Sequence, residues 1–304
     1  MRKPREWDAD VALDAAAAAR LVDDQFPQLA PSRLQPLGIG WDNAAFLVNG
    51  SLVFRFPRRR IAVDCILTEI EWLRVVAPAL PVPVPVPQYR GGPARGYPYP
   101  FAGYPLLPGK TACSARLSDR ARAANAAPLG RTLRALHSLT PPADAPGDAL
   151  GRADLASRVG KLRERLARIA RLERLGAARA RALRDTLSDL ADTRAWSGGP
   201  RWVHGDLYER HLLVDRRGAL CGVIDWGDLH AGDPAMDLMI AWTFLPPPAR
   251  PAFRDAYGPI DGASWRRARF RALQFAIALI EYGRAAGDTA LLEVGRRALR
   301  NSGT

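Results

Sequence analysis

Cysteine and long apolar runs are scarce in this chain of 304 residues. Its three cysteines, Cys65, Cys113 and Cys221, are far apart and form no CxxC pair, so they indicate reduced thiols of a cytoplasmic protein rather than a metal knuckle. No stretch approaches the ~20 apolar residues that a membrane helix needs, and residues 1–10 carry both signs of charge without an apolar core. The sequence therefore predicts neither a membrane partner nor a signal peptide.

Lysine is scarce as well: only three of the 44 basic residues are lysines, and the net charge is +13. A charge of this size is compatible with nucleic acid, a membrane surface or an anionic substrate as the partner. Its distribution is uneven, because residues 152–184 carry eleven basic and three acidic residues, whereas residues 204–237 carry three arginines and seven acidic residues. Apolar residues recur every three or four positions from Leu155 to Leu175, so 152–184 is predicted to be an amphipathic helix with a solvated arginine face.

The composition is that of a globular protein, with 48% hydrophobic and 25% charged residues. The length suggests one large or two modest domains. A β-rich first hundred residues precede a helical remainder with one small β insert, and the Pro/Gly-rich stretch 100–109 is the best boundary. We therefore expect an α+β fold with a first domain at 1–103 and a second at 104–304.

Local patterns predict individual elements of the first domain. The alanine-rich run 8–26 is predicted to be a helix that ends before Pro27, and 61–76 a second helix. Residues 52–56 alternate in the manner of a hairpin strand that follows a turn at Asn49 and Gly50.

Reactive side chains are densest between residues 204 and 226. Asp206 is followed five residues later by His211, which can bind a metal, and then, after a predicted strand, by a second acid, Asp225. Phosphoryl transfer needs such a set: one carboxylate orients the attacking hydroxyl, and the other groups hold Mg²⁺ against the phosphates. The alternative is that these are turn residues between short strands, where Asp and Gly are common.

The same segment resembles the catalytic signature of the aminoglycoside phosphotransferase (APH) family, which has the protein-kinase-like fold. The matching strings are His204-Gly205-Asp206-Leu207, Ile224-Asp225-Trp226, Gly232-Asp233-Pro234 and Asp237-Leu238. The resemblance implies two lobes, β-rich and then mainly helical, with Asp206 as the catalytic base and Asp225 as a Mg²⁺ ligand. His211 stands where the family usually has a metal-binding Asn, as it does in the similar H-G-D-L-Y-x-x-H string of macrolide phosphotransferases.

The resemblance also covers the nucleotide loop. It implies that Gly40, Asp42 and Asn43, with Trp41 in the bend, bind the nucleotide through backbone N–H groups that meet phosphate oxygens. Glycines in a hairpin are more often only turn residues, so this part of the match is less specific than the catalytic strings.

Further nucleotide-binding residues follow from the same resemblance. Arg55 takes the place of the phosphate-pairing cation, because no lysine lies on the matching strand. The resemblance implies that Glu69 is the ion-pair partner of Arg55, with Glu71 as the alternative. The other interpretation of either glutamate is that it belongs to a solvated helix face. Tyr104 and Leu106 are implied to bind adenine through their backbone groups.

From this resemblance we expect a small-molecule kinase that uses Mg²⁺ and transfers the γ-phosphate of ATP or GTP to a hydroxyl of an antibiotic-like acceptor, an aminoglycoside or a macrolide. A housekeeping metabolite kinase of the same family is one alternative, because a fold does not fix the acceptor. A homologue that binds nucleotide without turnover is another. We expect a cytoplasmic monomer or homodimer with a small-molecule partner.

A different class of protein would be a non-enzymatic nucleic-acid-binding protein that uses the arginine-rich segment 152–184. Such a surface needs aromatic or hydrogen-bonding side chains among its cations. The segment contains no aromatic residue, so we expect no nucleic-acid partner.

Other residues have both a structural and a functional interpretation. We expect His137, Asp233 and Asp237 to pack within helices or brace loops. The acidic residues near the motifs that a polycationic acceptor would use are Asp206, Asp228, Asp233 and Glu281. The aromatic residues that either line an acceptor pocket or belong to the core are Trp242, Phe244, Trp265 and Tyr282.

Overall fold

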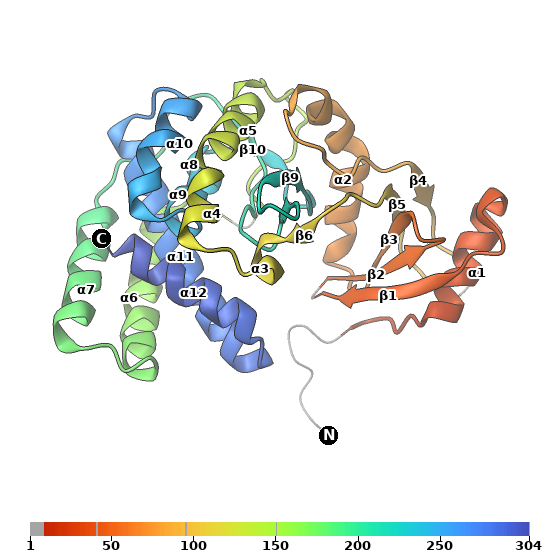
Figure 1. Cartoon of the computed structure of the whole chain (residues 1–304), viewed down its shortest axis with the longest axis horizontal. Coiled ribbons are helices and arrows are strands. Elements are labelled where there is room, and N and C mark those ends of the chain that lie inside the picture. The colour runs from red at the N-terminus through yellow and green to blue at the C-terminus, as the bar shows by residue number, and fades with distance from the viewer. Residues whose placement is uncertain (1–8, 41, 95, 150, 304) are drawn as a thin grey trace. The chain divides into compact units, whose positions relative to one another are not determined.

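The structure is a computed structural model that describes residues 9–40, 42–94, 96–149 and 151–303. It consists of two compact units (Figure 1). Each unit has its own apolar core. Unit 1 contains the described residues up to Pro78, together with Pro83–Leu107 and Asp225–Leu229. Unit 2 contains Ala79–Val82, Pro108–Ile224 and the described residues from His230 onward.

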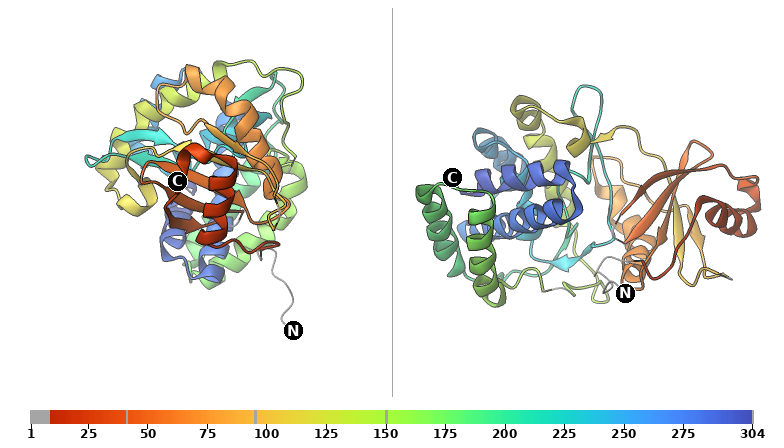
Figure 2. Two further views of the ribbon diagram at one scale, coloured as in Figure 1. Left: turned by 90° about the vertical axis from the view of Figure 1, so that its right-hand side faces the viewer. Right: turned by 90° about the horizontal axis from the view of Figure 1, so that it is seen from below.

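Unit 1 is built on a five-stranded antiparallel sheet in the order β1-β2-β3-β5-β4. In chain order its elements are α1 (Ala15–Gln25), η1 (Pro27–Leu29), β1 (Leu34–Ile39), β2 (Asn43–Val48), β3 (Leu52–Pro57), α2 (Ala62–Val76), β4 (Tyr89–Gly91) and β5 (Phe101–Pro105), with the 3-10 turn η2 (Ala77–Ala79) after α2. Helices α1 and α2 lie on opposite faces of the sheet (Figures 1 and 2).

Helix α1 begins later than the sequence predicts. The Asp14 carboxylate accepts a hydrogen bond from the N–H of Ala17 at 2.7 Å, which satisfies one of the unpaired donors of the first turn. Residues 9–14 are not helical. The prediction of a helix over 8–26 was therefore right about its end but wrong about its start.

The hairpin that joins β2 to β3 is confirmed. Asn49 and Gly50 have φ angles of 50° and 72°, and a two-residue turn with positive φ at both positions matches the twist of the strands it connects. The Asn49 side chain also accepts from the N–H of Arg33 at 2.8 Å. This turn fixes the register in which Arg55 lies opposite Ala45.

Strand alternation gives the two faces of the sheet different side chains, because successive residues point to opposite faces. The face toward α1 holds an apolar cluster that contains Ala18, Val22, Phe46, Phe54, Phe56 and Phe101. On the other face, Ala102 and Tyr104 of β5 pack against Ile66 of α2. Arg55 lies between Phe54 and Phe56 in the chain and therefore points toward α2.

Unit 2 is mainly helical, with two small antiparallel sheets of order β10-β7 and β6-β8-β9. In chain order its elements are β6 (Lys110–Thr111), α3 (Ala112–Ala115), α4 (Asp119–Ala124), α5 (Ala126–Ser138), α6 (Leu155–Leu172), α7 (Ala177–Ala191), β7 (Arg201–Val203), β8 (Leu212–Val214), β9 (Leu220–Val223), β10 (His230–Gly232), α8 (Ala235–Leu238), α9 (Ile240–Thr243), η3 (Pro247–Ala249), α10 (Arg250–Tyr257), α11 (Gly262–Ala286) and α12 (Thr289–Ser302). Helices α6 and α7 pack with α11 around a shared apolar cluster, and α12 lies beside α11 (Figure 2).

The predicted single helix over 152–184 was wrong, because the segment forms α6 and α7 with a break between them. Arg174 has a φ angle of 50°, which interrupts a right-handed helix. The Glu173 carboxylate, at the end of α6, pairs with Arg284 at 2.8 Å and with Arg296 at 2.6 Å. The amphipathic pattern itself is confirmed, since Leu162, Leu166 and Ile169 are buried.

The predicted α+β fold, β-rich first and helical afterwards, is confirmed. The boundary between residues 103 and 104 stays a prediction. No helix of the described ranges is long and apolar enough to cross a membrane.

Candidate functional site

In unit 1, the Glu69 carboxylate of α2 is the centre of a buried polar network. Arg55 donates to its Oε1 at 2.6 Å, and the backbone N–H of Trp226 donates to the same oxygen at 2.8 Å. The Tyr104 hydroxyl donates to Oε2. Glu69 is only 1% exposed, so these donors compensate for taking a carboxylate out of water.

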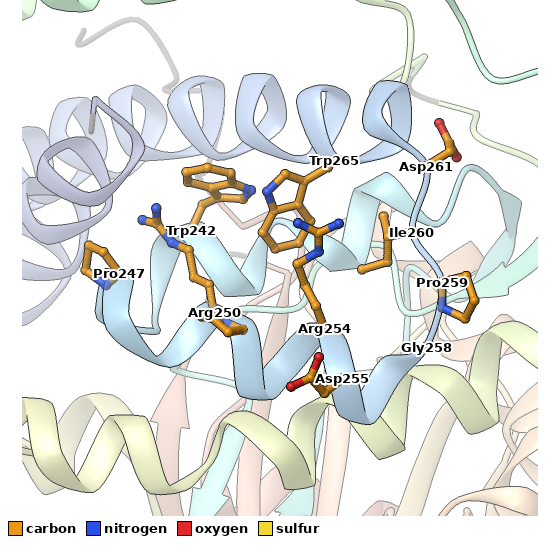
Figure 3. Close-up of a pocket in the computed structure, with 11 residues that line it drawn as sticks. Trp242, Pro247, Arg250, Arg254, Asp255, Gly258, Pro259, Ile260, Asp261 and Trp265 are labelled. Carbon is orange, nitrogen blue, oxygen red and sulfur yellow. The ribbon is translucent and has the colours of Figure 1, made fainter.

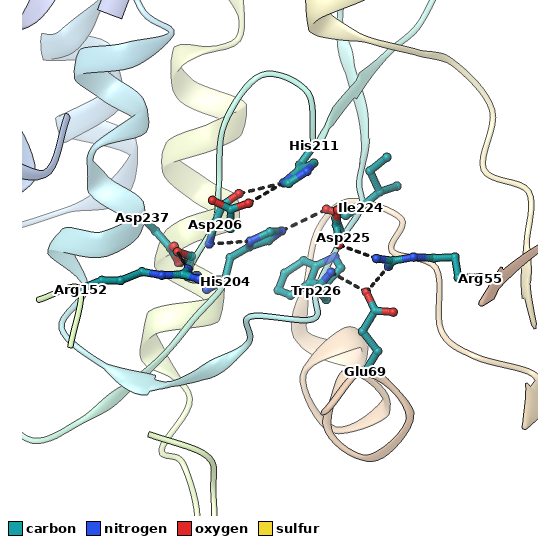
Figure 4. Close-up of polar contacts among 11 residues, drawn as sticks. Arg55, Glu69, Arg152, His204, Asp206, His211, Ile224, Asp225, Trp226 and Asp237 are labelled. Carbon is teal, nitrogen blue, oxygen red and sulfur yellow. Dashed lines mark hydrogen bonds and ion pairs between the residues drawn. The ribbon is translucent and has the colours of Figure 1, made fainter. Parts of the chain in front are cut away.

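Arg55 also holds Asp225, its Nη2 lying 2.7 Å from the Asp225 Oδ1 (Figure 4). Burial alone would lower the pKa of Arg55, but the negative charges of Asp225 and Glu69 outweigh it and hold that pKa above its usual value. The guanidinium therefore stays charged. The structure brings together Arg55 and Glu69, as predicted, and places Glu71 on the exposed side of α2.

Asp225 has a φ angle of 66°, in the left-handed region. Such a conformation is uncommon for a residue other than glycine and is kept where surrounding contacts fix it. Here the neighbouring N–H of Trp226 is held by Glu69. The carboxylate of Asp225 remains 42% exposed while it is paired with Arg55, so an oxygen that suits Mg²⁺ is accessible.

The predicted nucleotide loop is internally bonded. The N–H of Gly40 donates to the carbonyl of Asn43 at 2.9 Å, and the carboxylate of Asp42 is paired with Arg59. Asn43 is buried in β2, and its side-chain oxygen has no hydrogen-bond partner. Trp41 lies outside the described residues. A nucleotide that used the Gly40 N–H would have to replace the bond to Asn43.

Tyr104 and Leu106 lie at the end of β5. The Tyr104 side chain is buried against Glu69, a contact that the sequence did not reveal, while the N–H of Leu106 donates to the carbonyl of Ser51 at 2.9 Å. The Leu106 side chain is 45% exposed. The N–H of Leu106 is thus engaged within unit 1, and the contact of Tyr104 and Leu106 with adenine stays a prediction.

In unit 2, a buried carboxylate on α8 holds the loop that carries Asp206. Asp237 accepts hydrogen bonds from the N–H of His204 at 2.7 Å and of Gly205 at 3.0 Å (Figure 4). It also accepts from His137 Nε2 at 3.1 Å. Asp237 thus braces the loop rather than facing a substrate, as the sequence predicts.

His204 and His211 orient the same loop. His204 Nδ1 accepts from the N–H of Asp206 at 3.3 Å, so its Nε2 carries the proton and donates to the carbonyl of Ile224 at 3.1 Å. His211 Nδ1 lies 2.8 Å from the carbonyl oxygen of Asp206 and 3.7 Å from its Oδ2. Asp206 is therefore positioned by backbone contacts, with its carboxylate 28% exposed.

Two ion pairs fasten the rest of this loop to α12 and the residue before it. Glu209 pairs with Arg297, and Arg210 pairs with Asp288 at 2.7 Å. Neither pair was apparent in the sequence, because the partners are separated by more than seventy positions of chain. Together with Asp237 they make the loop a rigid support for Asp206.

Loss of the Asp237 charge should destabilise the protein in a pH-dependent way. Burial raises the pKa of Asp237, but the hydrogen bonds from His137 and from the backbone N–H of His204, with the electrostatic influence of the two imidazoles, outweigh it and hold that pKa below its ordinary value. A carboxylate of this kind stabilises the fold above its ordinary pKa of about 3.9 and loses that effect as the pH falls through its lower folded-state pKa. We expect Asp237→Asn to lower the free energy of unfolding by about 1–3 kcal/mol at pH 7.

Urea unfolding at pH 7 and at pH 3 checks this prediction. The stability difference between the wild type and Asp237→Asn should shrink at the lower pH. An equal difference at both values would show that the Asp237 charge does not bear on folding.

Two acidic residues that a polycationic acceptor would need are already paired. Asp233 is buried and lies 2.6 Å from Arg267, and Glu281 pairs with Arg165 at 2.6 Å and with Arg168. Asp233 therefore braces the start of α8, as one of its two interpretations predicts, and neither carboxylate is left unpaired for a polycationic acceptor. Asp228 is half-buried in unit 1.

The aromatic candidates divide into pocket and core. Trp242 and Trp265 line a cavity of about 880 Å³ in unit 2, with their ring centroids 5.2 Å apart (Figure 3). Arg250 stacks over Trp242 at 3.9 Å. Phe244 is buried in the core. Among the described residues, none from the loop 204–211 lines this cavity, so it does not place an acceptor beside Asp206.

The donor set for a metal is small. The described residues include no group of three or more His, Cys, Asp or Glu side chains placed to hold an ion. Asp225 offers oxygen, which Mg²⁺ prefers, and His211 offers nitrogen, which suits Mg²⁺ less well. Each of the two residues supplies one donor from its own unit, so an ion would need further ligands such as phosphate oxygens, and a site formed by both residues stays a prediction.

Solved structures similar to this chain include aminoglycoside and macrolide phosphotransferases. The GDP complex of wild-type aminoglycoside 2'-phosphotransferase-IIIa has a TM-score of 0.68 and 24% identity, with 96% of this chain and 99% of that chain covered. At this identity the similarity shows the fold alone. The apoenzyme of macrolide 2'-phosphotransferase MphH from Brachybacterium faecium has a TM-score of 0.56 and 25% identity, with 94% and 97% covered.

The family model described as the phosphotransferase enzyme family, APH, matches residues 33–271. The chain belongs to this family, as the motifs predict. The uncharacterized protein YcbJ of Bacillus subtilis (strain 168) is 29% identical over 76 residues, and this match spans 25% of each chain.

Proposed function

We propose that the protein transfers the γ-phosphate of ATP or GTP to a hydroxyl group of a small molecule. The observation that carries the proposal is the placement of Asp206 in a loop held by Asp237, within the family's catalytic string. A partly exposed carboxylate fixed in this way can accept the proton of an attacking hydroxyl. Solved relatives with GDP, ADP or ATP bound support a nucleotide as the donor.

On this proposal, Arg55 pairs with the nucleotide phosphates. Its guanidinium is held in place by Glu69 and reaches Asp225 with a second nitrogen, so it can turn that nitrogen to a phosphate oxygen without leaving Glu69. Gly40, Asp42 and Asn43 would meet the phosphates, and Tyr104 and Leu106 would lie beside the base. Asp225 and His211 would hold Mg²⁺, which would neutralise phosphate charge when bound.

The acceptor classes can be ranked by charge. Solved relatives bind kanamycin, gentamicin or streptomycin, and a macrolide phosphotransferase shares the fold. In this chain Asp233 and Glu281 are neutralised by arginines, which weakens the case for a polycationic aminoglycoside. A macrolide or a hydroxylated metabolite therefore fits this chain better.

Acceptor-dependent release of ADP or GDP in the presence of Mg²⁺ tests the proposal. The panel should contain aminoglycosides, macrolides and small hydroxy metabolites, with each nucleotide tried separately. We expect release to rise above the acceptor-free rate for at least one acceptor and to give a phosphate ester. Nucleotide binding without release for any acceptor would instead identify a homologue without turnover.

His211 should limit the affinity for Mg²⁺. An Asn side chain at this position would supply an amide oxygen in place of an imidazole nitrogen, and Mg²⁺ prefers oxygen. We expect His211→Asn to reach half-maximal transfer at about 3- to 10-fold lower free Mg²⁺ than the wild type.

Initial rates measured over a series of free Mg²⁺ concentrations check this prediction, with His211→Ala as the control that removes the ligand. The alanine variant should need more Mg²⁺ than the wild type. If the Asn variant needs as much Mg²⁺ as the alanine variant, residue 211 does not contact the ion.

A further inference from the structure

Three arginines of unit 2 lie beside the loop that carries Asp206. Arg152 donates from Nη1 to the carbonyl of Gly205 at 3.1 Å (Figure 4). Arg158, on α6, donates to the carbonyl of Gly151 at 2.8 Å and so belongs to the same neighbourhood. Arg271 comes from α11, far along the chain. The side chains around the Asp206 carboxylate are therefore basic, although the loop that carries Asp206 is itself acidic.

Arg271 is the most buried member of the cluster. It is 9% exposed, and its Nη1 donates to Gln274 Oε1 at 3.0 Å. Its guanidinium lies 5.6 Å from the ring of Phe275, which packs edge-on against Tyr208 at 5.1 Å. Tyr208 packs in turn on His211 at 4.4 Å. Arg271 is thereby tied to the catalytic loop through a chain of ring contacts.

The guanidinium of Arg271 is under-satisfied. Its Nε is buried and has no hydrogen-bond partner, and no carboxylate of the described residues forms an ion pair with it. A carboxylate or phosphate that binds a guanidinium side-on uses Nε together with one terminal nitrogen. The Nε of Arg271 is thus a buried donor from which a carboxylate or phosphate can accept a hydrogen bond.

The charges around Arg271 support the same conclusion. Burial lowers the pKa of Arg271 to about 10, and the positive charges of Arg152 and Arg158 act in the same direction, against Asp206 and Asp148. Asp148 is already engaged, because its carboxylate accepts from the N–H of Ala153 at 2.8 Å. An additional negative charge would favour the charged form of Arg271.

We propose that Arg271, with Arg152 and Arg158 beside it, binds an anionic group of the acceptor, a carboxylate or a phosphate, while a hydroxyl of the same molecule faces Asp206. The inference rests on the proposed function and narrows it: of the two acceptor classes favoured above it selects the hydroxylated metabolite and requires that this molecule be an anion. No covalent step is added, because the anionic group only anchors the acceptor for transfer.

A purely structural role for Arg271 is the competing explanation. In that case the guanidinium would stabilise the Asp206 carboxylate and pack against Phe275. Its loss would then lower the stability of the protein, or lower kcat equally for every acceptor. An anchoring role instead raises KM for anionic acceptors and leaves neutral ones almost unchanged.

A matched set of polyols tests the proposal: gluconate, glucose 6-phosphate, glucose and glucosamine carry a carboxylate, a phosphate, no charge and an ammonium group. Binding to the wild-type protein is measured by calorimetry at fixed ionic strength. We expect gluconate or glucose 6-phosphate to bind at least about 10-fold more tightly than glucose, and glucosamine to bind most weakly. The anion that binds more tightly shows whether the site recognises a carboxylate or a phosphate.

Two variants and one control complete the experiment. Arg271→Gln should weaken binding of the anion about 10-fold or more and leave glucose unchanged, and Arg271→Lys, which keeps the charge, should lie between it and the wild type. Arg163→Gln removes an exposed arginine of α6 and should leave all four affinities unchanged. Thermal unfolding confirms that each variant is folded.

The proposal is overturned if glucosamine binds as tightly as the tighter-binding anion, if neither anion binds, or if folded Arg271→Gln keeps the affinity for that anion. Failure of the proposed function has a different signature: the anions bind in the Arg271-dependent manner, yet no acceptor receives phosphate.

Discussion

Asp206→Asn should lower the acceptor-dependent rate of phosphoryl transfer by about 10²–10⁴-fold, the usual contribution of a positioned general base. The substitution keeps the shape of the side chain but removes its ability to take the hydroxyl proton. Asp206 is held through its backbone, by the Nδ1 atoms of His204 and His211, so the loop should keep its conformation. The affinity for ATP and GDP should therefore change little.

Steady-state kinetics with calorimetry of nucleotide binding separate these effects. Asp185→Asn is a matched control, because Asp185 is an exposed residue of α7, and it should behave as the wild type does. An Asp206→Asn variant that transfers phosphate at the wild-type rate would remove Asp206 from the mechanism.

Glu69→Ala should lower the free energy of unfolding by about 3–5 kcal/mol, the effect of removing one partner of a buried ion pair. Without Glu69, the guanidinium of Arg55, the Tyr104 hydroxyl and the Trp226 N–H lose their shared acceptor. Arg55 would keep only Asp225. We therefore expect nucleotide affinity to fall as well, since the cation is no longer held in position.

Glu71→Ala is the matched control for this prediction. Glu71 lies two residues further along α2 and is exposed, and surface substitutions of this kind usually change stability by within about 0.5 kcal/mol. Urea unfolding and calorimetric titration with ATP on both variants give the comparison. Equal stability losses at the two positions would contradict the central place of Glu69.

The Arg55–Glu69 pair was implied by the resemblance to the phosphotransferase family, and local patterns agree with it. Glu69 lies three residues after Ile66 and four before Leu73, on the side of α2 that faces the sheet. Alternation along β3 puts Arg55 on the face opposite Phe54 and Phe56. These periods place each residue on its face, but the pairing of the two residues came from the family resemblance.

Contacts between distant parts of the chain could not be predicted. The role of the Tyr104 side chain depends on the register that sets Val53 of β3 opposite Tyr104 of β5, and sequence periodicity does not specify that register. Glu281 was expected to be available to an acceptor. Its ion-pair partner Arg165 lies more than a hundred positions away in the chain, so the sequence did not reveal the pair. The sequence did not predict a role for Arg271, because most arginines are exposed. Its burial arises only when α11 packs in the core of unit 2.

The most direct test of phosphoryl transfer to an acceptor hydroxyl is to follow a labelled γ-phosphate. Wild-type protein and Asp206→Asn are incubated with Mg²⁺, γ-labelled ATP or GTP and the acceptors of the panel, and the acceptor is analysed by mass spectrometry. We predict a phosphate ester on a hydroxyl of an acceptor with the wild type and almost none with Asp206→Asn. Label found only in free phosphate, or equal ester formation by both proteins, would contradict the account.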